Sequence, residues 1–167
     1  MRTVTLGLAV SLDHFIAREN HAVDWLQWSK DVAAISAEYW KTIDTVLMGR
    51  KTFQMTRTAY PGVTNIVFSR TLQAAAGVTI VDSPPARYVR ALKAREGKGI
   101  AVIGGGVLAR ALFDGGVIDE LALNIHPVLL GRGIPLFHRL KKQLDLELLD
   151  HRLLQHQCVL LRYRVKR

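Results

Sequence analysis

Three short segments of the chain combine glycine or hydroxyl residues with a capacity to bind anions. They are Gly104-Gly105-Gly106, Gly49-Arg50-Lys51-Thr52 and Ser69-Arg70. Glycine lets the backbone bend sharply and approach a ligand closely, and free N–H groups at the start of a helix bind phosphate. A guanidinium group beside a hydroxyl group binds a phosphate monoester through charge-assisted hydrogen bonds. The residue types therefore indicate a ligand that carries several phosphate groups.

Each segment also has a simpler explanation. Many turns between a strand and a helix contain glycine for steric reasons alone, and Gly49–Thr52 also fits a helix cap with two solvated cations. Ser69-Arg70 taken alone fits a polar turn. Because each of the three segments follows a predicted strand, their combination favours a phosphate-binding site over three unrelated turns.

Hydrophobic periodicity predicts the elements that position these segments. Strands alternate with helices, which predicts an α/β fold with a mainly parallel central sheet and helices on both faces. The last two strands have no helix between them and predict a C-terminal antiparallel hairpin. Ligands bind beyond the carboxyl ends of parallel strands, where the three segments lie. The predicted strands are Thr3–Val10, Thr45–Met48, Val63–Phe68, Val78–Val81, Ile100–Ile103 and Val117–His126, then the hairpin of Leu144–Gln157 with Val159–Val165; the predicted helices are Ser29–Ile43, Lys51–Thr56, Pro84–Ala94 and Val107–Phe113, and Asp13–Asp24 is expected to be a loop.

Length and composition fit one globular domain, residues 1–167, with 49% apolar residues. The apolar stretches are too short to span a bilayer, no signal peptide is apparent, and Cys158 has no cysteine partner, so we expect a cytoplasmic protein without membrane contact. The net charge of +9 is compatible with nucleic acid, but the basic residues are scattered and favour anionic small molecules instead. The histidines show no ligand spacing, so no metal is expected.

Two common phosphate-binding motifs are absent from the sequence. The glycines do not have the spacing of the Rossmann dinucleotide fingerprint, and no GKS or GKT phosphate loop is present. The first predicted strand leads instead into Ser11-Leu12-Asp13-His14-Phe15-Ile16-Ala17. Nucleotide hydrolysis therefore has no support in the sequence.

Five motifs occur in order along nearly the whole chain. They are Ser11-Leu12-Asp13 with Ile16-Ala17, Val46–Phe53, Ser69-Arg70, Ile103–Gly106 and Pro127–Phe137. This ordered set resembles the dihydrofolate reductase superfamily, and most closely the C-terminal reductase domain of the riboflavin-biosynthesis protein RibD and its stand-alone relatives. The resemblance implies a dihydrofolate-reductase-like three-layer fold and NADPH as the cofactor.

The resemblance also implies roles for individual residues in cofactor binding. Ala9 and Ile16 are expected to line the nicotinamide pocket, and Ser69 and Arg70 to meet the adenosine end with its 2′-phosphate. The remaining expected contacts are with the phosphates and the pyrophosphate, from Gly49, Arg50, Lys51, Thr52, Gly104, Gly105, Gly106, Val107 and Leu108.

The residues that act on the substrate are less well defined. The family loop commonly has glycine where this chain has His14. The candidate catalytic carboxylates are Asp13, which either contacts substrate or caps a loop, and Asp31 and Glu38, which either serve as the acid of folate reductases or are solvated. Asn124 and His126 share one face of a strand and are candidates for substrate contact, although His126 is equally well a structural residue.

The resulting expectation is an NADPH-dependent reductase of a small heterocyclic substrate, of the 5-amino-6-(5-phosphoribosylamino)uracil reductase type. The alternatives are pteridine reduction of the dihydrofolate reductase type and a cofactor-binding protein without efficient catalysis. The sequence has no deaminase zinc motif, so a role in riboflavin biosynthesis stays open. The resemblance and the apolar segment Val128–Phe137 together predict a homodimer.

Overall fold

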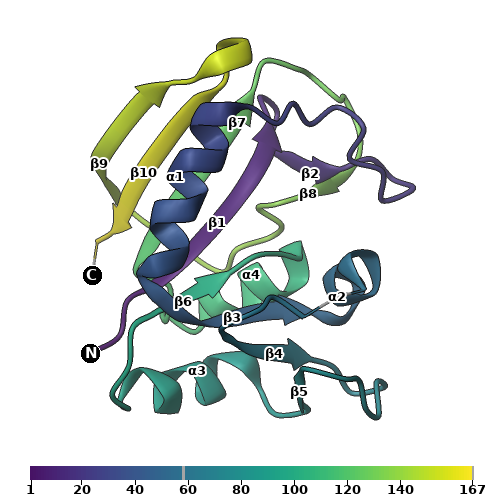
Figure 1. Cartoon of the computed structure of the whole chain (residues 1–167), viewed down its shortest axis with the longest axis vertical. Helices are drawn as coiled ribbons and strands as arrows, with labels where there is room; N and C mark the ends of the chain where they lie inside the picture. Colours follow the sequence, from purple (N-terminus) through teal and green to yellow (C-terminus); the bar gives the residue numbers. More distant parts are fainter. Residues whose placement is uncertain (58, 167) are drawn as a thin grey trace.

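The computed structural model describes residues 1–57 and 59–166, and an eight-stranded sheet runs through this part of the chain (Figure 1). The strand order is β5-β4-β3-β6-β1-β7-β10-β9. Neighbouring strands from β5 to β7 are parallel, whereas β10 is antiparallel to both β7 and β9. The strands of this sheet are β1 (Val4–Ser11), β3 (Ile43–Gly49), β4 (Thr64–Phe68), β5 (Thr79–Val81), β6 (Gly99–Val102), β7 (Glu120–His126), β9 (Leu146–Leu153) and β10 (Val159–Val165).

Helices cover both faces of the sheet, as Figure 1 shows. On one face lie α3 (Pro85–Lys93) and α4 (Gly106–Asp114), and on the other lies α1 (Lys30–Lys41). The short helix α2 (Arg50–Thr56) begins directly where β3 ends. This arrangement confirms the predicted α/β fold with a mainly parallel sheet and a C-terminal antiparallel strand pair.

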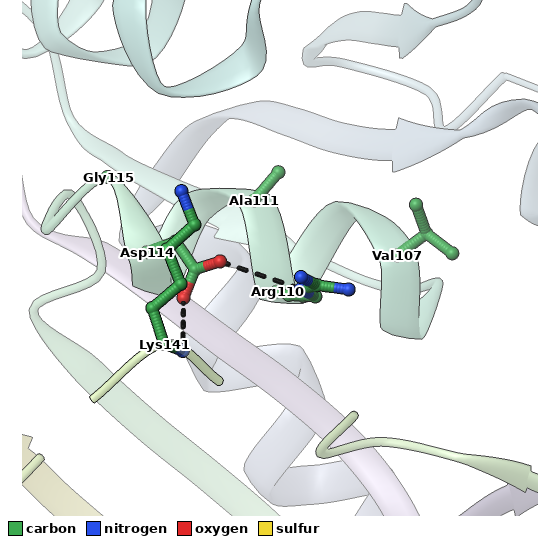
Figure 2. Close-up of a pocket in the computed structure, with 6 residues that line it drawn as sticks. All are labelled: Val107, Arg110, Ala111, Asp114, Gly115 and Lys141. Carbon is green, nitrogen blue, oxygen red and sulfur yellow. Dashed lines mark hydrogen bonds and ion pairs between the residues drawn. The ribbon is translucent and has the colours of Figure 1, made fainter. Parts of the chain in front are cut away.

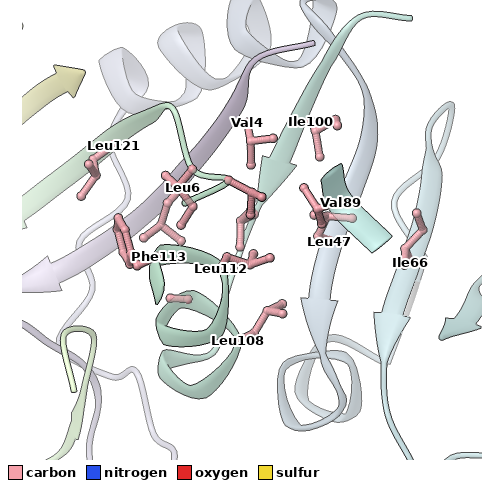
Figure 3. Close-up of a cluster of buried hydrophobic side chains, with 14 of the residues drawn as sticks. Val4, Leu6, Leu47, Ile66, Val89, Ile100, Leu108, Leu112, Phe113 and Leu121 are labelled. Carbon is pink, nitrogen blue, oxygen red and sulfur yellow. The ribbon is translucent and has the colours of Figure 1, made fainter. Parts of the chain in front are cut away.

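The main core lies between the sheet and the helices α3 and α4. Figure 3 shows Val4 and Leu6 of β1 directed toward Leu112 of α4, while Val89 of α3 lies close to Leu47. These side chains are almost completely buried. Because side chains alternate along a strand, the even-numbered residues of β1 fill this core, and the odd-numbered ones face α1.

The register of β1 and β7 decides which residues lie together under α1. In this parallel pair Ala9 is opposite Asn124, and Ser11 is opposite His126. All four residues belong to the strand positions that alternate with the core residues. The sheet thus presents Ala9 and Asn124 side by side near the carboxyl ends of β1 and β7.

Two short strands were not predicted from the sequence. β2 (Phe15–Ala17) and β8 (Ile134–Pro135) form a small antiparallel ribbon, and β2 lies within the predicted loop. Strands of this length are too short to show an alternating pattern. Beyond β9, a short 3₁₀ turn occupies Gln155–Gln157. Among the described helices, none combines the length and apolar character needed to cross a membrane.

Other differences from the predicted boundaries are small. The strand expected from Val117 begins at Glu120, because Val117 and Ile118 are buried in the connection after α4. Ser29 lies at the N-cap of α1 as predicted, but its hydroxyl group donates to the Asp31 carboxylate and accepts no hydrogen bond from the N–H groups of the first helical turn.

Candidate functional site

The three candidate anion-binding segments lie at one edge of the sheet. β4, β3 and β6 are neighbours in the strand order, and their carboxyl ends lead into Ser69-Arg70, Gly49–Thr52 and Gly104–Gly106 respectively. The register places Gly49 opposite Phe68, and Leu47 opposite Val102. Three segments spread over positions 49 to 106 of the sequence are therefore brought to the same end of adjacent strands.

The glycine turn leaves no room for a side chain at Gly104 or Gly106. Gly104 and Gly105 have φ values of 147° and 62°, a region that favours glycine. A Cβ atom on Gly104 would lie 2.9 Å from Thr52 Oγ1, and one on Gly106 would lie 2.5 Å from the Pro135 carbonyl oxygen. The turn is thus a backbone-lined cradle with a hydroxyl group beside it.

This cradle opens onto the first turn of α4. The N-cap residue is Gly105, which has no side-chain oxygen to occupy the first N–H groups of the helix. Val107 is 82% exposed, whereas the Leu108 side chain is buried in the core. Leu108 can therefore meet a ligand only through its backbone. The helix start offers N–H groups and a partial positive charge to an anion.

Cationic side chains that follow β3 and β4 have no acidic partner among the described residues. The Arg50 guanidinium group donates to Gln54 Oε1 at 3.2 Å, and Lys51 is exposed. Arg70 is exposed as well, and within the described residues none of these three cations forms an ion pair. Ser69 Oγ accepts hydrogen bonds from the backbone N–H groups of Thr71 and Leu72, at 3.2 and 2.9 Å, and so shapes the turn that presents Arg70.

The nicotinamide side predicted by the resemblance involves β1 and β2. Ala9 and Ile16 are both half-buried, and Ile16 packs against the main core from β2. β2 pairs with β8, whose Pro135 carbonyl oxygen abuts Gly106. The ribbon of β2 and β8 thus links the end of β1 to the glycine turn.

A buried cluster surrounds His126 at the end of β7. His126 Nδ1 is 3.5 Å from the Gln27 backbone nitrogen and 3.5 Å from Cys158 Sγ, and the Trp25 ring meets the imidazole edge-on with centroids 5.4 Å apart. His126 Nε2 is 3.3 Å from Asn124 Nδ2. Burial lowers the pKa of His126, so the ring stays uncharged at neutral pH.

Two polar atoms of this cluster have no hydrogen-bond partner in the described structure. They are Trp25 Nε1 and Asn124 Oδ1, and both are shielded from solvent. Buried polar atoms are nearly always paired in folded proteins. The unpaired atoms therefore mark a place where the protein has spare hydrogen-bonding capacity.

The three candidate carboxylates are already engaged or exposed. Asp13 accepts from Ser11 Oγ at 2.6 Å and from the backbone of Leu130 and Gly131 at 3.1 and 2.8 Å, which identifies it as a loop cap. The hydrogen bond from Ser11 is the main reason that the pKa of Asp13 is lowered. Glu38 is exposed and forms an ion pair with Lys41 at 2.6 Å.

Asp31 is also held by several donors. It accepts from the Ser29 hydroxyl group, from the Val32 backbone at 2.8 Å and from the Gln155 backbone at 2.7 Å. The hydrogen bond from Ser29 is the largest cause of its lowered pKa, followed by the one from Gln155. Asp31 thus joins α1 to the turn after β9, and as an ionised group it is a poor proton donor.

Comparison of the sequence with known proteins identifies the family of this chain. The model of the RibD C-terminal domain matches residues 2–160. The chain belongs to the RibD C-terminal domain family. Uncharacterized protein YwjB of Bacillus subtilis (strain 168) is 32% identical over 155 residues, which are 88% of this chain and 89% of YwjB.

Solved structures share the fold of this domain, and a dihydrofolate reductase is among them. A putative riboflavin biosynthesis protein from Shewanella sp. PV-4 has a TM-score of 0.84 at 25% identity and covers 99% of both chains. The dihydrofolate reductase from Enterococcus faecalis, complexed with NADP(H) and RAB-propyl, has a TM-score of 0.71 at 22% identity and covers 99% of this chain and 97% of its own.

A hollow on this RibD-type domain runs from Val107, in the first turn of α4, to Gly115 at the end of the helix. It has a volume of about 460 Å³ and follows the outer side of α4. Figure 2 shows Asp114 there between Arg110, at 3.5 Å, and Lys141, whose backbone nitrogen donates to it at 3.0 Å. Because this carboxylate already neutralises Arg110, we place the functional site at the strand ends, where cations are unpaired.

Sequence reasoning missed Trp25 and Cys158 as neighbours of His126. The segment around Trp25 has no periodicity, and its contact with His126 joins residues about 100 positions apart. The clue that the sequence does hold is the alternation along β7, which places Asn124 and His126 on one face. The cluster itself becomes visible only in three dimensions.

Proposed function

We propose that this protein is an NADPH-dependent reductase of a small heterocyclic substrate, of the RibD type. The observation that carries the proposal is the backbone-lined cradle at Gly104–Gly106, with Thr52 beside it and the N-terminus of α4 behind it. The cations Arg50, Lys51 and Arg70 follow β3 and β4, the strands next to β6 in the sheet. Several phosphate groups on one extended ligand match that arrangement, and NADPH carries them.

Different residues along the strand ends fit different parts of such a cofactor. The N–H groups at the start of α4 would receive the pyrophosphate, and Arg70 beside Ser69 would receive the 2′-phosphate. Ala9 and Ile16 would then border the nicotinamide ring, which donates the hydride. Bound NADPH supplies the hydride. The chain's own residues bind and orient the reactants, and the apolar side chains of β1 and β2 keep water away.

Reduction also requires a proton, and the carboxylates do not supply it in this proposal. Asp13 and Asp31 are held ionised by their hydrogen bonds, and Glu38 is exposed and ion-paired. We infer that solvent protonates the product, as expected for a domain without a dedicated acid. Pteridine reduction and a purely cofactor-binding role are the alternatives. Oxidation of NADPH by a panel of pteridine, pyrimidine and quinone-like compounds distinguishes an enzyme from a binding protein.

Calorimetric titration with NADPH and NADH tests the cofactor. NADPH should bind more tightly, and Arg70→Ala should reduce NADPH affinity by about 10- to 100-fold, because a charged hydrogen bond is worth about 1.5–3 kcal/mol. Affinity for NADH should change little. Arg87→Ala, which also removes an exposed arginine, is the matched control. Absence of NADPH binding, or an unchanged preference in Arg70→Ala, contradicts the proposal. A cytoplasmic location stays a prediction.

A further inference from the structure

One glycine of the central strand β1 has no structural reason to be a glycine. The chain contains thirteen glycines, and the structure describes all of them. Most of them have a positive φ angle, or lie so close to other atoms that a Cβ atom would crowd those atoms. The exceptions are Gly49, at the proposed phosphate site, and Gly7, whose Cβ atom would meet nothing within 4 Å. Neither the backbone conformation nor the packing therefore requires glycine at position 7.

A glycine in the middle of a strand is a cost to the fold. Glycine loses more conformational freedom on folding than any other residue, and it has no side chain to pack against the neighbouring strands. β1 is also a central strand of the sheet, between β6 and β7. β-Branched residues such as valine are favoured at such positions. A glycine that the fold does not need indicates a ligand that needs the space.

The sheet opens at Gly7. Among the described residues, β6 pairs with β1 only as far as Leu6, which is opposite Val102. The chain after β6 then turns away, and β1 continues beside β7 alone. The residues from Gly7 to Ala9 are half-buried, although Leu6 and Val10 on either side of them are completely buried. Solvent thus reaches the middle of a central strand.

Helix α1 does not close this opening. Gly7 belongs to the odd-numbered positions of β1, which face α1. Val32 and Ile35 lie on the side of α1 opposite to the exposed Ala34 and Ala37, so they face the sheet. Both are half-buried, and neither packs against the two hydrophobic clusters found in the described part of the chain. The first turns of α1 therefore leave apolar side chains partly uncovered on the face where Gly7 opens.

Small side chains surround Gly7 on this face of the sheet. Ala9 follows it about 6.6 Å further along the strand, and Ala122 is opposite it on β7. Asn124 is opposite Ala9, and Arg162 of β10 is opposite Ala122. A glycine between two alanines forms a flat floor with polar groups at its border. Such a floor fits a planar ring that lies against the strand, with polar substituents at the edge of the ring.

We propose that Gly7 is a specificity-determining residue, whose missing side chain lets a planar heterocyclic substrate lie flat against β1 beneath α1. The proposal rests on the reductase function proposed above, in which the nicotinamide ring lies beside Ala9. The substrate ring then lies next to the hydride donor and extends along the strand to Gly7. A larger side chain at this position would occupy the space of the ring and would also fill a gap in the fold. Activity and stability should therefore change in opposite directions.

Substitution of Gly7 by alanine and valine tests this opposition. The NADPH-loaded protein is assayed with 7,8-dihydrobiopterin and with 5-amino-6-(5-phosphoribosylamino)uracil. For the compound that is reduced, Gly7→Val should lower kcat/KM about 100-fold and Gly7→Ala about 3- to 10-fold, since added methyl groups compete with the ring for space. The Kd for NADPH should stay within about threefold. The Tm of Gly7→Val should rise by about 2–4 °C, because valine favours a strand more than glycine does.

The matched control is Thr79→Val, which places valine at an exposed position of the edge strand β5. It should leave kcat/KM unchanged. A retained kcat/KM in Gly7→Val overturns the proposal, and so does a loss of activity that comes with an equal loss of NADPH affinity or with a lower Tm. Reduction of neither compound by the NADPH-loaded wild type overturns the assigned substrate class.

Chemical labelling tests the open space without any turnover. Gly7→Cys should react with methyl methanethiosulfonate in the native protein, because an accessible thiol is reactive, and 7,8-dihydrobiopterin with NADP⁺ should slow this reaction. The wild type is the control, since its single cysteine, Cys158, is buried. An unreactive Gly7→Cys variant overturns the proposal. If NADPH does not bind to the wild type while Gly7→Cys still reacts, the proposed function fails and the substrate role of Gly7 falls with it, whereas the open space at Gly7 stands.

Discussion

At the residue scale, Asp31 shows how one carboxylate is committed to structure. Its oxygens hold Ser29, the first turn of α1 and the backbone of Gln155, so it ties the helix to the turn after β9. These hydrogen bonds depress its pKa below the ordinary value of 3.8. A group with a depressed pKa in the folded state contributes stability above its unfolded pKa, and this contribution disappears as the pH falls through the folded value.

We therefore predict that Asp31→Asn lowers the Tm at pH 7, and that the difference from the wild type shrinks below about pH 3.8. The value of kcat should change less than about threefold, since removal of a general acid costs about 10²-fold or more. Thermal unfolding at several pH values and steady-state rates provide the measurements. Asp82→Asn, at an exposed site, is the control. A kcat that falls a hundredfold with an altered pH profile would assign Asp31 the catalytic role that folate reductases give to such a residue.

The chemistry of single residues was only partly readable from the sequence. Glycines, arginines and hydroxyl groups that follow strands indicated a candidate phosphate-binding edge, and the structure brings these segments to one edge because a strand end fixes where its next residues lie. The choice between catalysis and loop capping for Asp13 depended on its partners Leu130 and Gly131, more than 100 positions away. A local pattern carries no information about such partners.

At the element scale, the glycine turn between β6 and α4 is the part of the fold that the proposed cofactor would contact. Gly105 and Gly116 have nearly equal φ values, 62° and 63°, so alanine imposes backbone strain at both. Their surroundings differ. A Cβ atom on Gly105 points into the cradle, 3.6 Å from Thr52 Oγ1, whereas one on Gly116 meets nothing within 4 Å.

Gly105→Ala should raise the Kd for NADPH about tenfold or more, because the added methyl group displaces the pyrophosphate from the helix start. Gly116→Ala should destabilise the protein by about 1–2 kcal/mol and leave the Kd within about twofold. Calorimetry and urea denaturation of both variants separate affinity from stability. Equal losses of affinity in the two variants would mean that the turn acts through stability alone.

Most helices and strands were predictable from the sequence, because each is long enough for its hydrophobic pattern to repeat. Apolar residues alternate along β7, and strands alternate with helices along the chain; together these patterns predicted the parallel sheet. The ribbon of β2 and β8 escaped prediction, since its strands have only three and two residues. Its position against Gly106 comes from packing between distant segments, with no local signal.

At the scale of the whole molecule, the edge strand β9 exposes one apolar face. Leu146, Leu148 and Leu153 are 40%, 51% and 78% exposed, and they stand opposite Val165, Tyr163 and Val159 of β10. The charged residues of the hairpin pair among themselves, as Arg164 does with Glu147. Exposed edges with apolar side chains are usually covered, because they otherwise promote aggregation.

We propose that a second copy of the chain covers this face and forms the predicted homodimer. Two identical edges can meet around a two-fold axis, since such an interface uses the same surface on both subunits. The sequence pointed to Val128–Phe137 instead, but Leu136 of that segment is buried within its own chain and Phe137 packs on Phe113. Of this segment, Leu129 is exposed enough, at 70%, to serve as a control.

Light scattering of the purified protein and two lysine variants tests this interface. The wild type and Leu129→Lys should be dimers, whereas Leu148→Lys, with a charge in the centre of the apolar face, should be a monomer with a similar Tm in dilute solution. Burying an unpaired ammonium group costs more than a contact between two leucines contributes, so a single substitution suffices. A monomeric wild type contradicts dimerisation, and a dimer that Leu129→Lys alone disrupts would move the interface to the loop after β7.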